Sequence, residues 1–278
     1  MIDAIAASAE GLRRVFQESI VARDLAEPLA SFDSTSETKV IREFMVERPL
    51  TVLGIRVDGI VKGYLHQERL DNRSITDQMH PLEDAAVVAT TSAVQSVVNL
   101  LDRHPFVLVA TLGQPVGVIH RHDLEKPPMR MWLFGMITLF EMSLTRIIDR
   151  AYPDESWQAS LSEARAEKAK ELQNERARRK ETVKLIDCLQ LSDKGQIFAK
   201  SDTLRERFWQ RSKNEIRSVV KDLEKLRNNL AHSQPYTAAN WDAIRRLADT
   251  LDRLLELSPD YVAVNSLLPF DEGQQPND

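Results

Sequence analysis

The 278-residue sequence contains a single cysteine, Cys188, and no uncharged hydrophobic run long enough to cross a bilayer. One cysteine cannot form a disulfide within the chain, and it excludes a zinc site built from several cysteines. The longest uncharged apolar run, residues 131–140, is about half of what a membrane-spanning helix requires and predicts a buried helix instead. Acidic residues occur within the first ten positions, which is untypical of a secretory signal. These absences predict a cytoplasmic protein with no membrane span.

A large excess of positive charge is also missing. The first 127 residues carry 13 basic and 18 acidic side chains, and the remainder carries 24 of each. Neither half is a polycation of the kind that binds duplex DNA through charge alone, so any nucleic-acid contact is expected to be local. The hydrophobic share of 42% and the charged share of 28% are ordinary for a globular protein, and the length suffices for two domains.

The first half alternates between helix and strand signals in an internal repeat of about 55 residues. Runs rich in Val, Ile and Leu predict strands at residues 50–57, 60–65, 106–111 and 116–120. A helix is expected before each pair of strands, with capping boxes formed by Ser34 with Glu37 and by Ser92 with Gln95. This pattern predicts an α/β unit made of two copies.

The repeat resembles the CBS domain, which occurs as a tandem pair and binds adenine nucleotides or related ligands in clefts between the copies. The resemblance covers roughly residues 24–125 and rests on a helix, a strand, a turn and the pattern Gly-hydrophobic-x-polar-x-x-Asp-Leu. In that family a hydroxyl residue three positions after the glycine and an aspartate six positions after it hold phosphate and ribose. The resemblance therefore implies nucleotide binding by Gly117, His120 and Asp123 of the second copy.

The first copy departs from this pattern, because it has Gly63, His66 and Arg69 at the matching positions. A histidine replaces the hydroxyl residue in both copies, and the aspartate survives only in the second. One occupied cleft is therefore expected rather than two, with an adenine nucleotide as effector and no required cofactor. A degenerate pair that serves as a dimerisation scaffold is the alternative.

Beyond Lys126-Pro127-Pro128 the sequence predicts an all-α helical bundle. The predicted helices span residues 130–151, 154–190, 201–232 and 238–257. The expected domains are accordingly residues 1–126 and 129–260, followed by a tail at 261–278. The densely charged stretch 163–181 is interpreted either as a solvated helix with i,i+4 ion pairs or as a surface that contacts RNA.

Two charged residues fall inside otherwise apolar helix stripes. Arg227 lies among Ile216, Val219, Val220, Leu223, Leu226 and Leu230 when each residue advances about 100° around a helix. Glu141 lies in the same way among Leu133, Ile137, Phe140, Leu144 and Ile148. Because an unpaired buried charge is costly, we expect Glu141 and Arg227 to lie close together, either as a structural ion pair or beside an active site.

The segment Arg227-Asn228-Asn229-Leu230-Ala231-His232, near the end of a helix, resembles the HEPN superfamily. Many HEPN proteins are metal-independent ribonucleases, whereas others only bind nucleotides or partners. In active members two protomers dimerise so that both Arg-x4–6-His motifs face one cleft. The resemblance covers roughly residues 129–258, and it implies catalytic roles for Arg227, Asn228 and His232, with Glu141 beside them.

The chemistry of RNA cleavage agrees with these residue types. A histidine titrates near neutral pH and can take the proton of the 2′-hydroxyl. An arginine offers a fixed fork of donors for the charge that develops on the phosphate oxygens. On a helix Arg227 and His232 point about 140° apart, which favours a site shared across a homodimer. His232 also has a purely structural interpretation, as a cation in the last helical turn.

The leading hypothesis is a ligand-regulated, dimeric, metal-independent endoribonuclease, and the resemblance suggests a role in stress response or phage defence. The alternative is a non-catalytic dimeric regulator in which the helical domain serves interaction only. No His, Asp and Glu set shows metal-ligand spacing in the sequence, and His80, His104 and His122 are interpreted as loop or surface residues. No metal site is expected.

Overall fold

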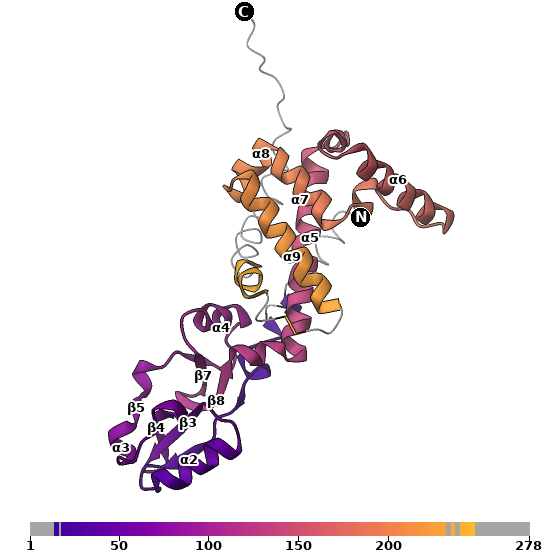
Figure 1. Ribbon diagram of the computed structural model, residues 1–278. Coiled ribbons are helices and arrows are strands. Elements are labelled where there is room, and N and C mark those ends of the chain that lie inside the picture. The colour runs from indigo at the N-terminus through magenta and orange to yellow at the C-terminus, as the bar shows by residue number, and fades with distance from the viewer. Residues whose placement is uncertain (1–13, 17, 232–234, 237–239, 248–278) are drawn as a thin grey trace, which may run out of the picture. The chain divides into compact units, whose positions relative to one another are not determined.

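The computed structural model describes residues 14–16, 18–231, 235–236 and 240–247. The chain divides into two compact units, and among the described residues these comprise 14–132 and 133–247 (Figure 1). The division falls inside helix α5 (Pro127–Ala151). The two prolines predicted to separate the domains form the first turn of this helix, where their missing N–H groups would have no intrahelical partner.

The N-terminal unit contains two four-stranded sheets of mixed direction. The first has the spatial order β2 (Ser31–Asp33), β3 (Val52–Val57), β4 (Ile60–His66) and β5 (His80–Pro81). The second has the order β6 (Val87–Ala89), β7 (Phe106–Thr111), β8 (Gln114–His120) and β1 (Glu27–Pro28).

Both sheets have the same topology. In each, a leading strand pairs in parallel with the first strand of a hairpin, and a short outer strand pairs antiparallel with the second. The outer strand of the second sheet is β1, which precedes the first repeat in sequence. The four strands predicted from the sequence are confirmed, and the sheets show that the sequence repeat is also a structural repeat.

Each copy carries one main helix, α2 (Thr38–Glu47) in the first and α4 (Val94–Leu101) in the second. The apolar face of α2 packs with β3 and β4 in a core of Ile41, Met45, Leu53, Ile55, Leu65 and Ile75. A second cluster joins the two copies and contains Val52, Tyr64, Phe106, Leu108 and Val118. A short helix, α3 (Ile75–Gln78), follows the first hairpin.

The predicted capping boxes are wrong. Helix α2 begins after Glu37 and α4 begins after Ala93, and neither has a side-chain cap. The hydroxyl of Ser92 instead accepts a hydrogen bond from the backbone N–H of Ala89 at 3.1 Å. Ser92 therefore stabilises the turn before α4 and does not cap the helix. Serine side chains often form such hydrogen bonds with nearby backbone groups outside helices.

The second unit is helical. Besides α5 it contains α6 (Glu163–Arg178), α7 (Leu191–Lys200), α8 (Asp202–Leu204), a π-helical turn (Arg205–Trp209), α9 (Lys213–Ala231) and a helical segment at residues 240–247.

The described residues of both units also form short 3₁₀ turns. These are η1 (Ala22–Asp24), η2 (Gln67–Arg69), η3 (Leu82–Asp84), η4 (Arg121–Glu125), η5 (Ser156–Ser160) and η6 (Leu185–Cys188).

Two of the predicted long helices are wrong. The stretch 154–190 is interrupted at Leu161, which is extended, and at Lys180, which has a φ of 63°. The stretch 201–232 is interrupted at Gln210, with a φ of 48°, and α7 was not predicted at all. Helix propensity runs through these breaks, but burial of apolar residues around them decides the chain path. Part of the helix predicted at 238–257 and the predicted tail lie outside the described residues.

Helix α5 is the core helix of the second unit. It is long and apolar enough to cross a membrane by length and composition, but 56% of its most apolar window is buried inside the protein. Phe140 of α5 contacts Trp209, and Trp209 meets Phe198 of α7 edge-on at 6.1 Å. This pattern agrees with the buried helix predicted for residues 131–140. Helix α6 extends away from α5, α7 and α9 (Figure 1).

Candidate functional site

A cluster of three charged side chains joins the helices of the second unit. The carboxylate of Glu141 in α5 contacts Lys194 of α7, with 2.9 Å between Oε1 and Nζ. Its other oxygen, Oε2, lies 3.7 Å from Nη1 of Arg227 in α9. The prediction that Glu141 and Arg227 lie close together is therefore confirmed.

The packing of α7 against α9 positions this cluster. A Cβ atom at Gly195 would lie 2.6 Å from a methyl carbon of Val220, so only glycine permits this approach of the two helices. The approach buries the neighbouring Lys194, whose side chain is 5% exposed. A buried ammonium requires a counter-ion, and Glu141 supplies it.

Lys194 was missed in the sequence analysis. It lies three residues after Leu191 and four before Phe198, both fully buried, and so falls in the apolar stripe of α7. The same periodicity argument that singled out Arg227 would have found it, but only for a helix that begins at Leu191. The prediction of one continuous helix up to residue 190 concealed this signal.

The remaining predicted catalytic residues follow Arg227 along α9. Asn228 is exposed in the last turns of the helix, and α9 ends at Ala231. His232 lies outside the described residues. Among the described residues, the candidate site therefore consists of Glu141, Lys194, Arg227 and Asn228.

The cluster combines two cations with one carboxylate and carries an excess of one positive charge. The side chain of Arg227 is 33% exposed, whereas Lys194 is buried. Both oxygens of Glu141 lie close to a cation: Oε1 accepts a hydrogen bond from Lys194, and Oε2 forms a longer ion pair with the guanidinium of Arg227. The arrangement leaves Arg227 as the part of the cluster that an anion in solvent can reach.

The second candidate region is the end of β8 in the N-terminal unit. Gly117, predicted to belong to a nucleotide-binding set, pairs with Pro28 of β1. A Cβ atom at this position would lie 3.0 Å from Cβ of Ala26 and 3.1 Å from the carbonyl oxygen of Glu27. The close approach of the outer strand thus explains this glycine without a ligand.

Asp123, predicted to bind ribose, is only 2% exposed. Its Oδ2 accepts a hydrogen bond from the backbone N–H of His120 at 2.7 Å, and its Oδ1 lies 2.9 Å from Nζ of Lys126. Burial alone would raise the pKa of this carboxyl, but the hydrogen bonds from His120 and Lys126 outweigh it and lower the pKa to about 2. Asp123 is therefore ionised and satisfied within the protein.

His120 connects the two copies of the repeat. Its Nε2 lies 2.6 Å from the hydroxyl of Thr51, which immediately precedes β3 of the first copy. The matching His66 of the first copy contacts Tyr64 and Phe106, and His80 stacks on Tyr64 at 5.3 Å between ring centroids. The interpretation of His80 as a loop or surface residue is wrong, because it begins strand β5 and contacts this ring cluster.

The expectation that no metal-ligand set exists is also wrong in one place. His120, His122 and Asp123 offer ligand atoms that all lie within 4.8 Å of one another. The sequence His-x-His-Asp contained this signal. The structure adds that η4 turns the segment so that the three side chains meet.

The N-terminal part of the chain is similar in fold to CBS-domain pairs. The CBS-pair protein CBSX2 of Arabidopsis thaliana has 17% sequence identity and a TM-score of 0.34, and the match covers 37% of this chain and 90% of that one. A CBS domain-containing protein of unknown function from Bacillus anthracis has 15% identity and a TM-score of 0.35, with 40% and 94% covered. A CBS-domain pair solved with 5′-methylthioadenosine and S-adenosyl-L-methionine has 15% identity and a TM-score of 0.34, with 37% and 95% covered.

No protein-family model and no curated protein matches the chain. The similarity to solved structures concerns the fold of the N-terminal unit alone.

Proposed function

We propose that the protein is a dimeric, metal-independent endoribonuclease regulated by an adenine nucleotide that binds the N-terminal pair of repeats. The observation that carries the proposal is the contact between Glu141 and Arg227, which come from helices 86 positions apart in the sequence. This contact places a carboxylate beside a partly exposed guanidinium, one residue before the exposed Asn228 and five positions before His232 in the sequence.

In this proposal the 2′-oxygen of RNA attacks the adjacent phosphorus, and the bond from phosphorus to the 5′-oxygen breaks. His232 takes the proton of the 2′-hydroxyl, and the second copy of this histidine in the dimer returns a proton to the leaving 5′-oxygen. Arg227 donates hydrogen bonds to the phosphate oxygens as their charge grows. The products are a 2′,3′-cyclic phosphate and a 5′-hydroxyl.

Glu141 acts in this scheme as a positioning residue. It holds the guanidinium of Arg227 and at the same time neutralises the buried Lys194. Asn228, exposed at the next position of the helix, orients the phosphate in this proposal. The proposal thus assigns the four predicted residues distinct roles, with Lys194 as the support of Glu141.

The test is incubation of the full-length protein with labelled RNA in EDTA, with and without AMP, ADP, ATP or S-adenosyl-L-methionine. Wild type is expected to produce cyclic-phosphate ends. Arg227→Lys keeps a cation beside Glu141 but loses the fork of donors, and is expected to lower the rate at least about tenfold. Lys225→Ala, an exposed position on the same helix, is the matched control and should retain the wild-type rate.

A non-catalytic dimeric regulator is the second candidate, because both oxygens of Glu141 are engaged by cations as in a structural ion pair. In that case no RNA is cleaved under any nucleotide condition, while calorimetry still detects nucleotide binding and light scattering still detects a dimer. Nucleotide binding without cleavage would therefore replace the first proposal by the second. Absence of both activities would refute both.

A further inference from the structure

The segment that follows β8 gathers two histidines and a carboxylate around one point. Nδ1 of His120 lies 3.6 Å from Oδ2 of Asp123, and Nε2 of His122 lies 3.9 Å from the same oxygen. In a tetrahedral zinc site, bonds of about 2.0–2.1 Å place neighbouring ligand atoms roughly 3.3 Å apart. The two separations from Asp123 exceed this value by less than 1 Å. All three ligand atoms lie within 4.8 Å of one another, so the two histidines must approach each other to share an ion.

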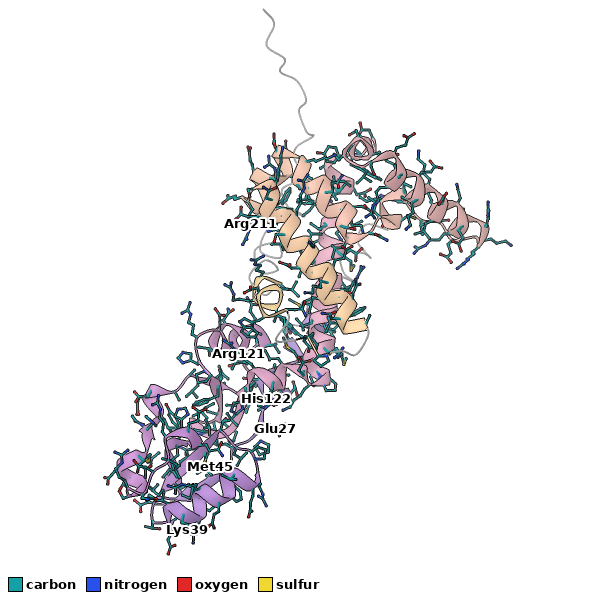
Figure 2. All side chains as sticks on the ribbon, in the orientation of Figure 1. Glu27, Lys39, Met45, Arg121, His122 and Arg211 are labelled. Atoms are coloured by element: carbon teal, nitrogen blue, oxygen red, sulfur yellow. The ribbon has the colours of Figure 1, made fainter. Side chains whose placement is uncertain are left out.

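His122 is the side chain that must move to bring the three ligand atoms to metal-binding separations, and it is the most exposed of the three. His122, labelled in Figure 2, is 74% exposed. It stacks on His120, with 5.0 Å between ring centroids and 12° between ring planes. A rotation of His122 about its side-chain bonds costs no core packing. His120 and Asp123 are 16% and 2% exposed, so two of the three ligands are held by the protein.

The contacts around these two residues are those that support metal ligands. The hydroxyl of Thr51 lies 2.6 Å from Nε2 of His120, and when Nε2 donates this hydrogen bond the lone pair of Nδ1 faces Asp123. Asp123 is in turn fixed by the backbone N–H of His120 and by Lys126. Such outer contacts set the tautomer and orientation of metal-binding histidines and carboxylates.

The local charge also permits a cation. Lys126 lies beside Asp123, but Glu27 contacts the same ammonium at 2.5 Å and offsets its charge. The three groups Asp123, Lys126 and Glu27 together carry one negative charge. The guanidinium of Arg121 is directed elsewhere, because its Nε donates to the carbonyl of Leu101 at 2.9 Å.

The first copy of the repeat provides a contrast. Its matching segment is His66-Gln67-Glu68-Arg69, so a glutamate and an arginine stand where the second copy has His122 and Asp123. An arginine cannot ligate a metal ion and repels it. The ligand set is a property of the second copy alone.

We propose that His120, His122 and Asp123 bind one zinc ion or a similar divalent transition-metal ion, with water as the remaining ligand. Neutral imidazole and carboxylate oxygen are the ligands that such ions take. The ion would join the end of β8 to η4. This site lies in the N-terminal unit and takes no part in the proposed RNA cleavage, which proceeds in EDTA.

The test uses tag-free, full-length protein that has been stripped with EDTA and dialysed. Titration with Co²⁺ followed by visible absorbance, and then competition with Zn²⁺, is expected to show one ion bound per chain. His122→Gln is expected to weaken Zn²⁺ binding at least tenfold. Because His122 is exposed, this variant should retain the fold, which circular dichroism checks.

Two further histidine variants serve as controls for the Zn²⁺ titration. His104→Gln removes a histidine outside the set, and His66→Gln removes the counterpart of His120 in the first copy; both should bind Zn²⁺ as wild type does. Zn²⁺ should also raise the Tm of wild type but not that of His122→Gln. Equal binding by wild type and His122→Gln, or no binding by wild type, would overturn the proposal whatever the outcome of the RNA assay.

Discussion

The two copies of the N-terminal repeat share one topology but differ at the tip of their last strand. Both sheets have a parallel leading strand, a hairpin and an antiparallel outer strand, and both place a glycine opposite that outer strand. After the glycine the first copy continues to His66 and an exposed Arg69, whereas the second continues to His120 and a buried Asp123.

This difference distinguishes residues that strand packing requires from residues that could bind a ligand. The glycines recur because each pairs with a closely approaching outer strand of its sheet, and this steric requirement is the same in both copies. The residues three and six positions after each glycine do not pair with the outer strand. Of the two copies, only the second has a buried carboxylate there, Asp123, which pairs with Lys126. Recurrence of a residue in an internal repeat therefore need not indicate a ligand.

The largest expected loss of stability follows replacement of Gly63, and the loss at Gly117 should be smaller. A Cβ atom at Gly63 would lie 2.4 Å from the carbonyl oxygen of His80, which is backbone and cannot move aside cheaply. Gly63→Ala is expected to lower the free energy of unfolding by about 3 kcal/mol, and Gly117→Ala by about 1 kcal/mol because its nearest atom is 3.0 Å away. Urea denaturation of both variants measures the difference, and equal losses would contradict the packing explanation.

An intermediate effect concerns Asp123. Its pKa is lowered to about 2 from the ordinary 3.8, so the folded protein favours the ionised form and gains stability above pH 3.8 that is lost as the pH falls towards 2. Asp123→Asn is expected to cost about 2 kcal/mol at pH 7 and to flatten the acid unfolding curve between pH 4 and 2.

The measurement is chemical denaturation across this pH range in EDTA. Arg69→Gln, the matching position of the first copy, is the control and should leave the pH dependence between pH 4 and 2 unchanged. A parallel downward shift of the Asp123→Asn curve at all pH values would show that the variant damages packing rather than a titrating ion pair.

The smallest effect concerns His66. Its pKa lies below the ordinary 6.5 because of burial first, then because of the nearby His80 and Arg69. The unfolded chain therefore takes up this proton before the folded protein does, and stability falls as the pH drops below 6.5. His66→Gln should remove part of the loss between pH 7 and pH 5, measured by thermal unfolding at the two values. Equal losses of stability in wild type and His66→Gln would contradict this explanation.

The sequence predicted those parts of the structure whose signals are local. Val, Ile and Leu runs located the four hairpin strands, and one charged residue in each of two apolar stripes located Glu141 and Arg227. The starts of α2 and α4, the interruption at Gln210 and the separate helix α7 were not predicted, because helix propensity continues across these points. Lys194 remained hidden for the same reason.

The sequence by itself determined the repeat, the helical second half and the need of Arg227 for a partner, since periodicity and the cost of a buried charge are properties of neighbouring residues. Only the tertiary structure decided that β1 completes the second sheet and that Gly195 lets α7 carry Lys194 to Glu141. It also decided that Thr51 of one copy supports His120 of the other. These contacts join residues far apart in the chain, and their formation depends on the packing of whole elements.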